Sequence, residues 1–134
     1  MTAHKRYKVT VDTLPQDYPN DFEMRAAEII AQYFQTDVVF MRVRGSGNTA
    51  DLNIKGVHWE IKSPTGNSKR TIENNLKEAH KQSSKIVLDL GRTDMPFLRA
   101  RSRARYYLKT YAKYISEVLI ITKGGQVVPI YKRK

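Results

Sequence analysis

The sequence predicts an α/β fold in which helices flank a mixed β-sheet. Segments with apolar residues every three or four positions alternate with short runs of strand character, and some of those strands follow one another directly while others are separated by helices. The predicted order is helix, three strands, helix, strand, helix and two strands. A chain of 134 residues fits one domain with a modest core.

The N-terminal residues predict an arm over 1–19, followed by a single domain over 20–134. Residues 1–19 are polar and contain Pro15 and Pro19, with strand character only over 7–11. Asn20 can cap the first helix, and Glu23 stands where a capping box places its acidic partner. The apolar spacing predicts a buried stripe on this helix, formed by Phe22, Ala26, Ile29, Ile30 and Tyr33.

The later elements follow from the same patterns. The β-branched and aromatic content of residues 37–44 predicts a strand, and the sequence GSGNT at 45–49 breaks it. Helical spacing continues over 69–84 and 97–115, with a short apolar strand over 85–90 between the two helices. Two further strands, 118–122 and 127–131, surround a glycine-containing turn.

The stretch DLNIKGVHWEIK, residues 51–62, predicts a hairpin with one polar and one apolar face. A two-residue turn at Lys55-Gly56 would place Asp51 directly opposite Glu60. Like charges in such a pair are destabilising, and a divalent cation is one way to compensate. The alternative is a polar face in water, where the repulsion is weak. Lys-Gly is also a weaker turn signal than Asn-Gly, so the register can slip.

The charge of the chain predicts a polyanionic partner. The net charge is +11 and the isoelectric point is about 10.0. Residues 95–134 carry ten basic side chains and one acidic side chain, so the excess lies mainly in the last third. The absence of cysteine excludes disulfides and thiolate metal sites.

The predicted helix over 97–115 carries most of this excess. Its basic residues alternate with tyrosines, as on surfaces that bind phosphates and stack bases. The alternative is an ordinary solvated face, with some of the tyrosines buried. Its buried side is predicted to contain Leu98, Leu108, Ala112 and Ile115. The predicted nucleic-acid contacts on it are Arg99, Arg101, Arg103, Arg105 and Lys109.

One set of residues resembles a nuclease motif. Glu23 on the first helix, Asp51 on the second strand and Glu60-Ile61-Lys62 on the third resemble the PD-(D/E)xK superfamily, which has an αβββαβ restriction-endonuclease-like core. Residues 21–94 are more closely similar to the C-terminal tRNA-nuclease toxin domain of contact-dependent growth inhibition (CdiA) proteins. This likeness rests on ADLNIKG, HWEIKSPTG and TIENNLKEAHKQSSKIVLDL.

The resemblance implies a metal-dependent endoribonuclease that cleaves tRNA, either a growth-inhibition toxin or a mobile-element relative of one. It implies that Asp51, Glu60 and the Ile61 carbonyl hold Mg²⁺ or Mn²⁺. Lys62 would orient the attacking water or stabilise charge on the phosphoryl group. Glu23 and Gln82 would complete the site. Their simpler interpretations are a helix cap for Glu23 and an exposed helix residue for Gln82.

Several alternatives stay open from the sequence. His58 lies beside Glu60 on the polar face and can contact the nucleic acid. The protein can also be a DNA endonuclease of a phage or mobile element, or a nucleic-acid-binding module without catalysis. A toxin would act in the cytoplasm of target cells after delivery within a larger secreted protein, and it would require an acidic immunity protein in the producing cell.

Overall fold

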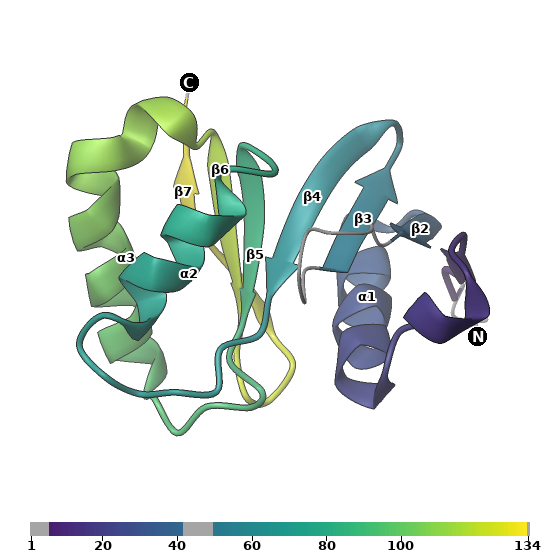
Figure 1. The fold of residues 1–134 in the computed structure, drawn as a ribbon, viewed down its shortest axis with the longest axis horizontal. Helices are drawn as coiled ribbons and strands as arrows, with labels where there is room; N and C mark the ends of the chain where they lie inside the picture. The colour runs from purple at the N-terminus through teal and green to yellow at the C-terminus, as the bar shows by residue number, and fades with distance from the viewer. Residues whose placement is uncertain (1–5, 42–49, 134) are drawn as a thin grey trace, which may run out of the picture.

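A computed structural model describes residues 6–41 and 50–133 of the chain. Its centre is one seven-stranded mixed sheet in which the strands follow chain order, β1-β2-β3-β4-β5-β6-β7 (Figure 1). Three α-helices connect or cover these strands in the described residues. The predicted class, a mixed sheet flanked by helices, is therefore confirmed.

The sheet contains three parallel and three antiparallel strand pairs. The pairs β1/β2, β4/β5 and β5/β6 are parallel, whereas β2/β3, β3/β4 and β6/β7 are antiparallel. The strands are β1 (Val9–Val11), β2 (Val38–Met41), β3 (Ala50–Ile54), β4 (Val57–Lys62), β5 (Lys85–Asp89), β6 (Glu117–Ile121) and β7 (Val127–Lys132). The helices are η1 (Pro15–Asp17), α1 (Asp21–Phe34), α2 (Thr71–Ala79), α3 (Phe97–Tyr111) and η2 (Ala112–Tyr114).

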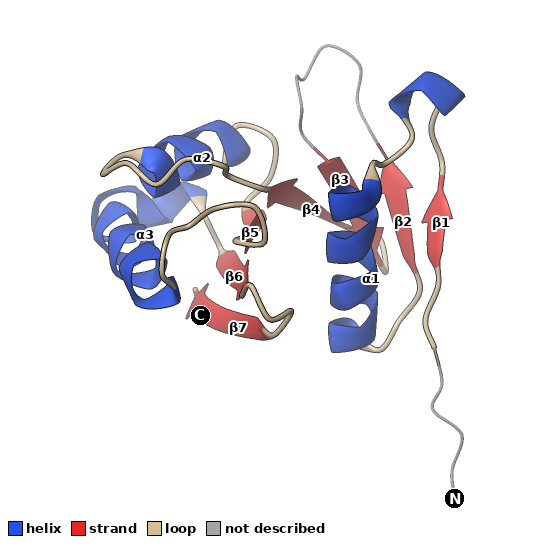
Figure 2. Ribbon diagram, turned by 90° about the horizontal axis from the view of Figure 1, so that it is seen from below, coloured by secondary structure: helices blue, strands red, loops and turns tan. Residues whose placement is uncertain are grey.

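The helices bury the two faces of the sheet separately (Figure 2). Helix α1 packs with Phe40, Leu52 and Trp59 on one face. Helices α2 and α3 pack on the other face, around Ile86 and Leu88 of β5. Because successive side chains of a strand point to opposite faces, β5 contributes to both cores. The hairpin of β3 and β4 buries its apolar side against α1, so its polar side faces the half of the molecule that contains α2.

Helix α1 begins where the sequence predicts. The Asn20 side chain accepts a hydrogen bond from the Glu23 amide, and the Glu23 carboxylate accepts one from the Asn20 amide. The predicted buried stripe is only partly correct, because Tyr33 is 42% exposed. The buried positions of this helix are Glu23, Ala26, Ala27, Ile30 and Ala31. Small alanines let the helix approach the sheet closely; Ala26 belongs to the predicted stripe, whereas Ala27 and Ala31 do not.

The other two helices are shorter than predicted. Helix α2 ends at Ala79. In the turn that follows, the Ser83 hydroxyl donates a hydrogen bond to the His58 carbonyl and accepts one from the Lys85 amide. Helix α3 buries Ala100, Ala104, Tyr107 and Leu108. Leu98 is 64% exposed, so its predicted burial is wrong. It precedes Ala100 by two positions, about 200° around a helix.

The segment predicted as an arm contributes to the sheet. Val9–Val11 form β1, which lies at one edge and pairs with β2. The side chain of Gln32 donates to the Tyr7 carbonyl and so ties this segment to α1. The break predicted over 45–49 lies outside the described residues. No helix of the described chain is long and apolar enough to span a membrane.

Candidate active site

The hairpin has the predicted register. Asp51 pairs with Glu60, Leu52 with Trp59, and Asn53 with His58. Lys55 and Gly56 have φ values of 52° and 82°, the left-handed conformation that two-residue hairpins require. The Asn53 side chain accepts a hydrogen bond of 2.8 Å from the Gly56 amide. This contact supports the turn and offsets the weak preference of Lys for that position.

Three titratable side chains converge on the polar side of the hairpin. Asp51 and Glu60 are buried, with relative exposures of 2% and 0%. The His58 Nε2 lies 3.0 Å from Asp51 Oδ1 and 3.8 Å from Glu60 Oε1. One ligand atom from each of the three residues lies within 4.8 Å of the others. The predicted carboxylate pair is thus brought together, and His58 joins it.

The chemistry of these three groups fits a divalent cation. Two buried carboxylates facing each other repel, and a cation between them removes that repulsion. Carboxylate oxygens suit Mg²⁺ and Mn²⁺, whereas an imidazole nitrogen suits Mn²⁺ and later transition metals better than Mg²⁺. Since a carboxylate only accepts hydrogen bonds, His58 Nε2 donates to Asp51 in the present arrangement. In that state His58 orients Asp51, and it could bind a cation only after losing that proton.

Lys62 lies on the same side of β4 as Glu60, two residues further on, and borders a cleft of about 980 Å³. The cleft opens at the carboxyl end of β4 and is bordered by η1, the first turns of α1 and α2, and the loops after β4 and β5. Asp51, His58 and Glu60 do not form its walls. The carboxylates therefore lie further along the hairpin, and Lys62 is the residue that shares their side of the hairpin and also borders the cleft.

The remaining predicted site residues are placed less centrally. Glu23 is buried in its capping box and borders the cleft from α1, so it lies outside the cluster of three. Ile61 pairs with Ala50 and Val87 and also borders the cleft. Gln82 was expected on the second helix, but it lies exposed in the turn that follows α2. The roles predicted for all three stay predictions.

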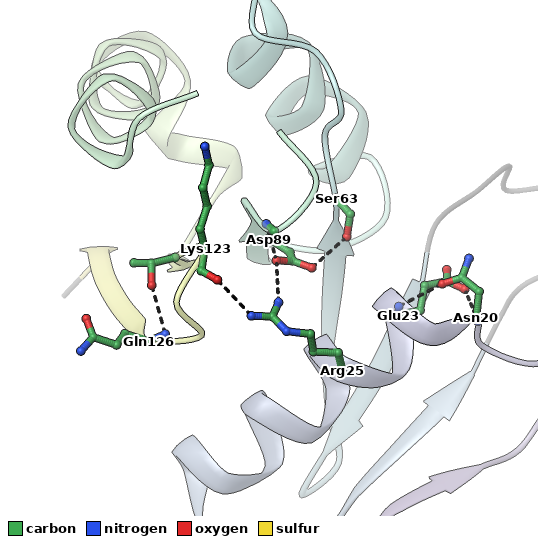
Figure 3. Close-up of polar contacts among 9 residues, drawn as sticks. Asn20, Glu23, Arg25, Ser63, Asp89, Lys123 and Gln126 are labelled. Carbon is green, nitrogen blue, oxygen red and sulfur yellow. Dashed lines mark hydrogen bonds and ion pairs between the residues drawn. The ribbon is translucent and has the colours of Figure 1, made fainter. Parts of the chain in front are cut away.

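A network that the sequence did not reveal fixes the strand end beside Lys62 (Figure 3). Asp89, fully buried at the end of β5, accepts a hydrogen bond of 2.9 Å from the Gly91 amide and one of 3.4 Å from the Ser63 hydroxyl. Arg25 of α1 approaches the same carboxylate at 3.9 Å and donates to the Lys123 carbonyl. No local motif marks these residues, because their partners are distant in the chain.

The basic helix α3 divides into two groups of side chains. Arg99, Arg105 and Lys109 are exposed. Arg103 is half-buried, donates to the Glu73 carboxylate and the Lys69 carbonyl, and so joins α3 to α2. Arg101 lies over the Phe97 ring at 5.6 Å. The three exposed residues remain able to contact phosphates, as predicted, whereas Arg103 already has a structural role.

Comparisons with known proteins place the chain in a family. The family model of the contact-dependent growth inhibition CdiA C-terminal domain matches residues 48–127, more than half of the chain. The match extends well beyond residue 94, where the resemblance noted in the sequence ended. A search among curated proteins gave no match.

A solved structure has the same fold. It is a CdiA-CT/CdiI toxin and immunity complex from Burkholderia pseudomallei, with a TM-score of 0.58 and 20% sequence identity. The similarity covers 91% of this chain and 98% of that one. At this identity the likeness concerns the fold alone. The family match carries the assignment: this chain belongs to the contact-dependent growth inhibition CdiA C-terminal domain family.

Proposed function

We propose that this growth-inhibition toxin domain is a metal-dependent endoribonuclease that cleaves tRNA. The observation that carries the proposal is the pairing of two buried carboxylates across the hairpin, Asp51 of β3 and Glu60 of β4, the strand that ends at Lys62. Burying two like charges together is unfavourable for folding, so a functional reason for their position is favoured over a structural one. The sequence motif and the family membership agree with this interpretation.

In the proposed site, Asp51 and Glu60 hold Mg²⁺ or Mn²⁺. The bound cation would supply charge neutralisation at the phosphoryl oxygens and a more acidic water. His58 keeps Asp51 in one orientation through their hydrogen bond of 3.0 Å. Lys62 borders the cleft, where its ammonium group can orient the attacking water or stabilise the negative charge that develops on the phosphoryl oxygens.

The proposed substrate follows from charge and family. The exposed cations of α3, Arg99, Arg105 and Lys109, provide a phosphate-binding surface. The resemblance of the hairpin and of the segment after it to tRNA-nuclease toxins favours tRNA over DNA as the substrate.

We also propose that an acidic immunity protein neutralises the domain. The solved structure with the same fold is a toxin and immunity complex. A net charge of +11 gives an acidic partner a strong electrostatic attraction. The domain would reach the cytoplasm of target cells as part of a larger secreted protein.

Cleavage assays with total tRNA and with plasmid DNA, in Mg²⁺, Mn²⁺ or EDTA, test the proposal. Wild-type protein should cleave tRNA only with metal. Asp51→Asn and Glu60→Gln should lower the rate by at least about 100-fold, as is typical when charge stabilisation at a transition state is lost. Glu78→Gln removes an exposed carboxylate of α2 and should cleave normally. Normal cleavage by both site variants would refute the site, and cleavage of DNA alone would refute the RNA assignment.

A further inference from the structure

The cleft beside Lys62 has rigid walls. The Thr93 hydroxyl donates a hydrogen bond of 2.6 Å to the Gly66 carbonyl, which joins the loop after β4 to the loop after β5. Ser68 is bonded to the Thr71 hydroxyl through both its amide and its side chain, and Ser63 is bonded to Asp89. Each of these contacts fixes one point of the loop 63–68. A cleft that is already formed loses little entropy when a ligand enters it.

The cleft brings phosphate-binding and base-binding groups together. Arg92, from the loop after β5, stacks on the Phe22 ring at 3.8 Å and borders the cleft together with Lys62. This stacking holds the guanidinium plane in place before a phosphate arrives. The acidic residues on the walls, Asp17 and Glu23, come from η1 and α1. Lys62 and Arg92 are the cations among the lining residues, so a phosphate that enters the cleft would contact these two side chains.

Tyr18 supplies an aromatic surface at the same cleft. Tyr18 directly follows η1 and is 55% exposed. It borders the cleft on the η1 side, whereas Asn74 borders the cleft from α2. Stacking on an aromatic ring binds any base, whereas an amide can hydrogen-bond a base edge. An exposed tyrosine at a polar cleft fits this use better than a packing role.

The size of the cleft limits what can enter. A volume of about 980 Å³ is close to the upper end for small-ligand pockets, about 300 to 1,000 Å³. Paired bases have their faces covered by stacking and their edges used in pairing. Only an unpaired nucleotide can present a phosphate and a base face here together.

We infer that this cleft binds an unpaired nucleotide of the RNA substrate, with its phosphate on Arg92 and its base stacked on Tyr18. The inference rests on the proposed function and makes it more specific: the scissile region would lie in a loop or single-stranded end of a structured RNA. Lys62 belongs to both sites, so the nucleotide in the cleft would adjoin the phosphodiester that the hairpin residues act on.

Fluorescence anisotropy in EDTA tests the inference without cleavage. The probes are a labelled single-stranded RNA, the same strand annealed to its complement, and the corresponding single-stranded DNA. Wild-type protein should bind the single-stranded RNA most tightly. Tyr18→Ala and Arg92→Ala should each weaken that binding by about tenfold, within the range for one stacked base. Tyr18→Phe keeps the ring and should restore wild-type affinity.

Two matched variants control for the loss of a ring or a charge elsewhere. Tyr33→Ala removes an exposed ring of α1, and Lys132→Ala removes an exposed cation of β7; neither residue borders the cleft. Both should bind like wild-type protein. Equal affinity for duplex and single strand, or wild-type affinity in Tyr18→Ala and Arg92→Ala, would overturn the inference. Equal affinity for single-stranded DNA would overturn the choice of RNA.

These outcomes are separable from failure of the proposed function. Asp51→Asn should keep the preference for single-stranded over duplex RNA in EDTA, because Asp51 does not border the cleft. If Asp51→Asn cleaved tRNA normally while Tyr18→Ala lost binding, the inference about the cleft would be supported and the proposed catalytic site would be refuted. If Asp51→Asn lost cleavage while Tyr18→Ala and Arg92→Ala bound normally, the reverse would hold.

Discussion

Among single residues, Tyr107 links the protonation of a side chain to folding. Its ring is 7% exposed and stacks on Tyr111 with 4.6 Å between centroids. Burial raises the pKa of Tyr107 above its ordinary value of 10.0, with further contributions from Tyr111 and Glu73. The folded state therefore holds the phenol proton more tightly than the unfolded state. This stabilisation is complete below pH 10.0 and is lost as the pH rises through the folded-state pKa.

Tyr107→Phe should remove this pH dependence, since phenylalanine has no proton to lose. Denaturant titrations from pH 8 to pH 11 measure it as the free energy of unfolding. The curves of the two proteins should run parallel below about pH 9, and that of the wild type should fall more steeply above about pH 10. Parallel curves over the whole range would contradict the assignment to Tyr107.

The residues of the candidate site on the hairpin could be predicted because a strand has a simple periodicity. Alternation alone put Asp51, His58, Glu60 and Lys62 on one side, and a two-residue turn put Asp51 opposite Glu60. Arg25, Asp89 and Arg92 could not be found in this way. Their contacts join positions far apart in sequence, and such contacts depend on how the helices pack rather than on any local pattern.

At the scale of elements, the packing of α2 against α3 depends on Arg103, which was predicted from the sequence to contact nucleic acid. The Arg103 side chain of α3 donates hydrogen bonds to the Glu73 carboxylate of α2 and to the Lys69 carbonyl. Arg103→Ala should lower the free energy of unfolding by about 1–2 kcal/mol, because the pair is only partly screened by water. Urea titration monitored by circular dichroism measures this loss.

Arg105→Ala is the matched control, two positions along the same helix. Arg105 is exposed, so its replacement should change stability by no more than about 0.5 kcal/mol. It should instead weaken RNA binding. If the two variants lost equal stability, the bridge between α2 and α3 would contribute nothing measurable.

The elements themselves were mostly predictable, and their ends were not. The capping box of α1 placed its start correctly because Asn20 and Glu23 satisfy each other locally. The end of α2 was wrong by five residues: the chain turns after Ala79, and the Ser83 hydroxyl in this turn bonds to the His58 carbonyl and the Lys85 amide. Leu98 was assigned to the core, but α3 turns a face of alanines and Tyr107 towards the sheet.

For the whole molecule, the antiparallel strands β2 to β4 include the hairpin with the candidate site, and the parallel strands β4 to β6 support α2 and α3. The sequence indicated both kinds of pairing, because adjacent strands without a helix between them read as antiparallel and strands separated by a helix as parallel. It gave strand character to residues 7–11 but did not indicate that this segment would pair with β2 at the edge of the sheet, because the choice of a pairing partner depends on how the whole chain packs.

The excess positive charge of the whole molecule makes a final prediction about salt. If the exposed cations of α3 contact phosphates, the plot of log binding constant against log salt concentration should be steep for wild-type protein. Replacing Arg99, Arg105 and Lys109 by alanine should reduce that slope by about 2, since each phosphate contact on a single strand contributes about 0.7.

A control triple variant at Lys8, Lys123 and Lys132 removes the same charge from exposed positions elsewhere. Because counterion release requires contact, the control should lower affinity only slightly and keep the wild-type slope. Equal slopes for the two triple variants would show that net charge, and not the surface of α3, governs RNA binding.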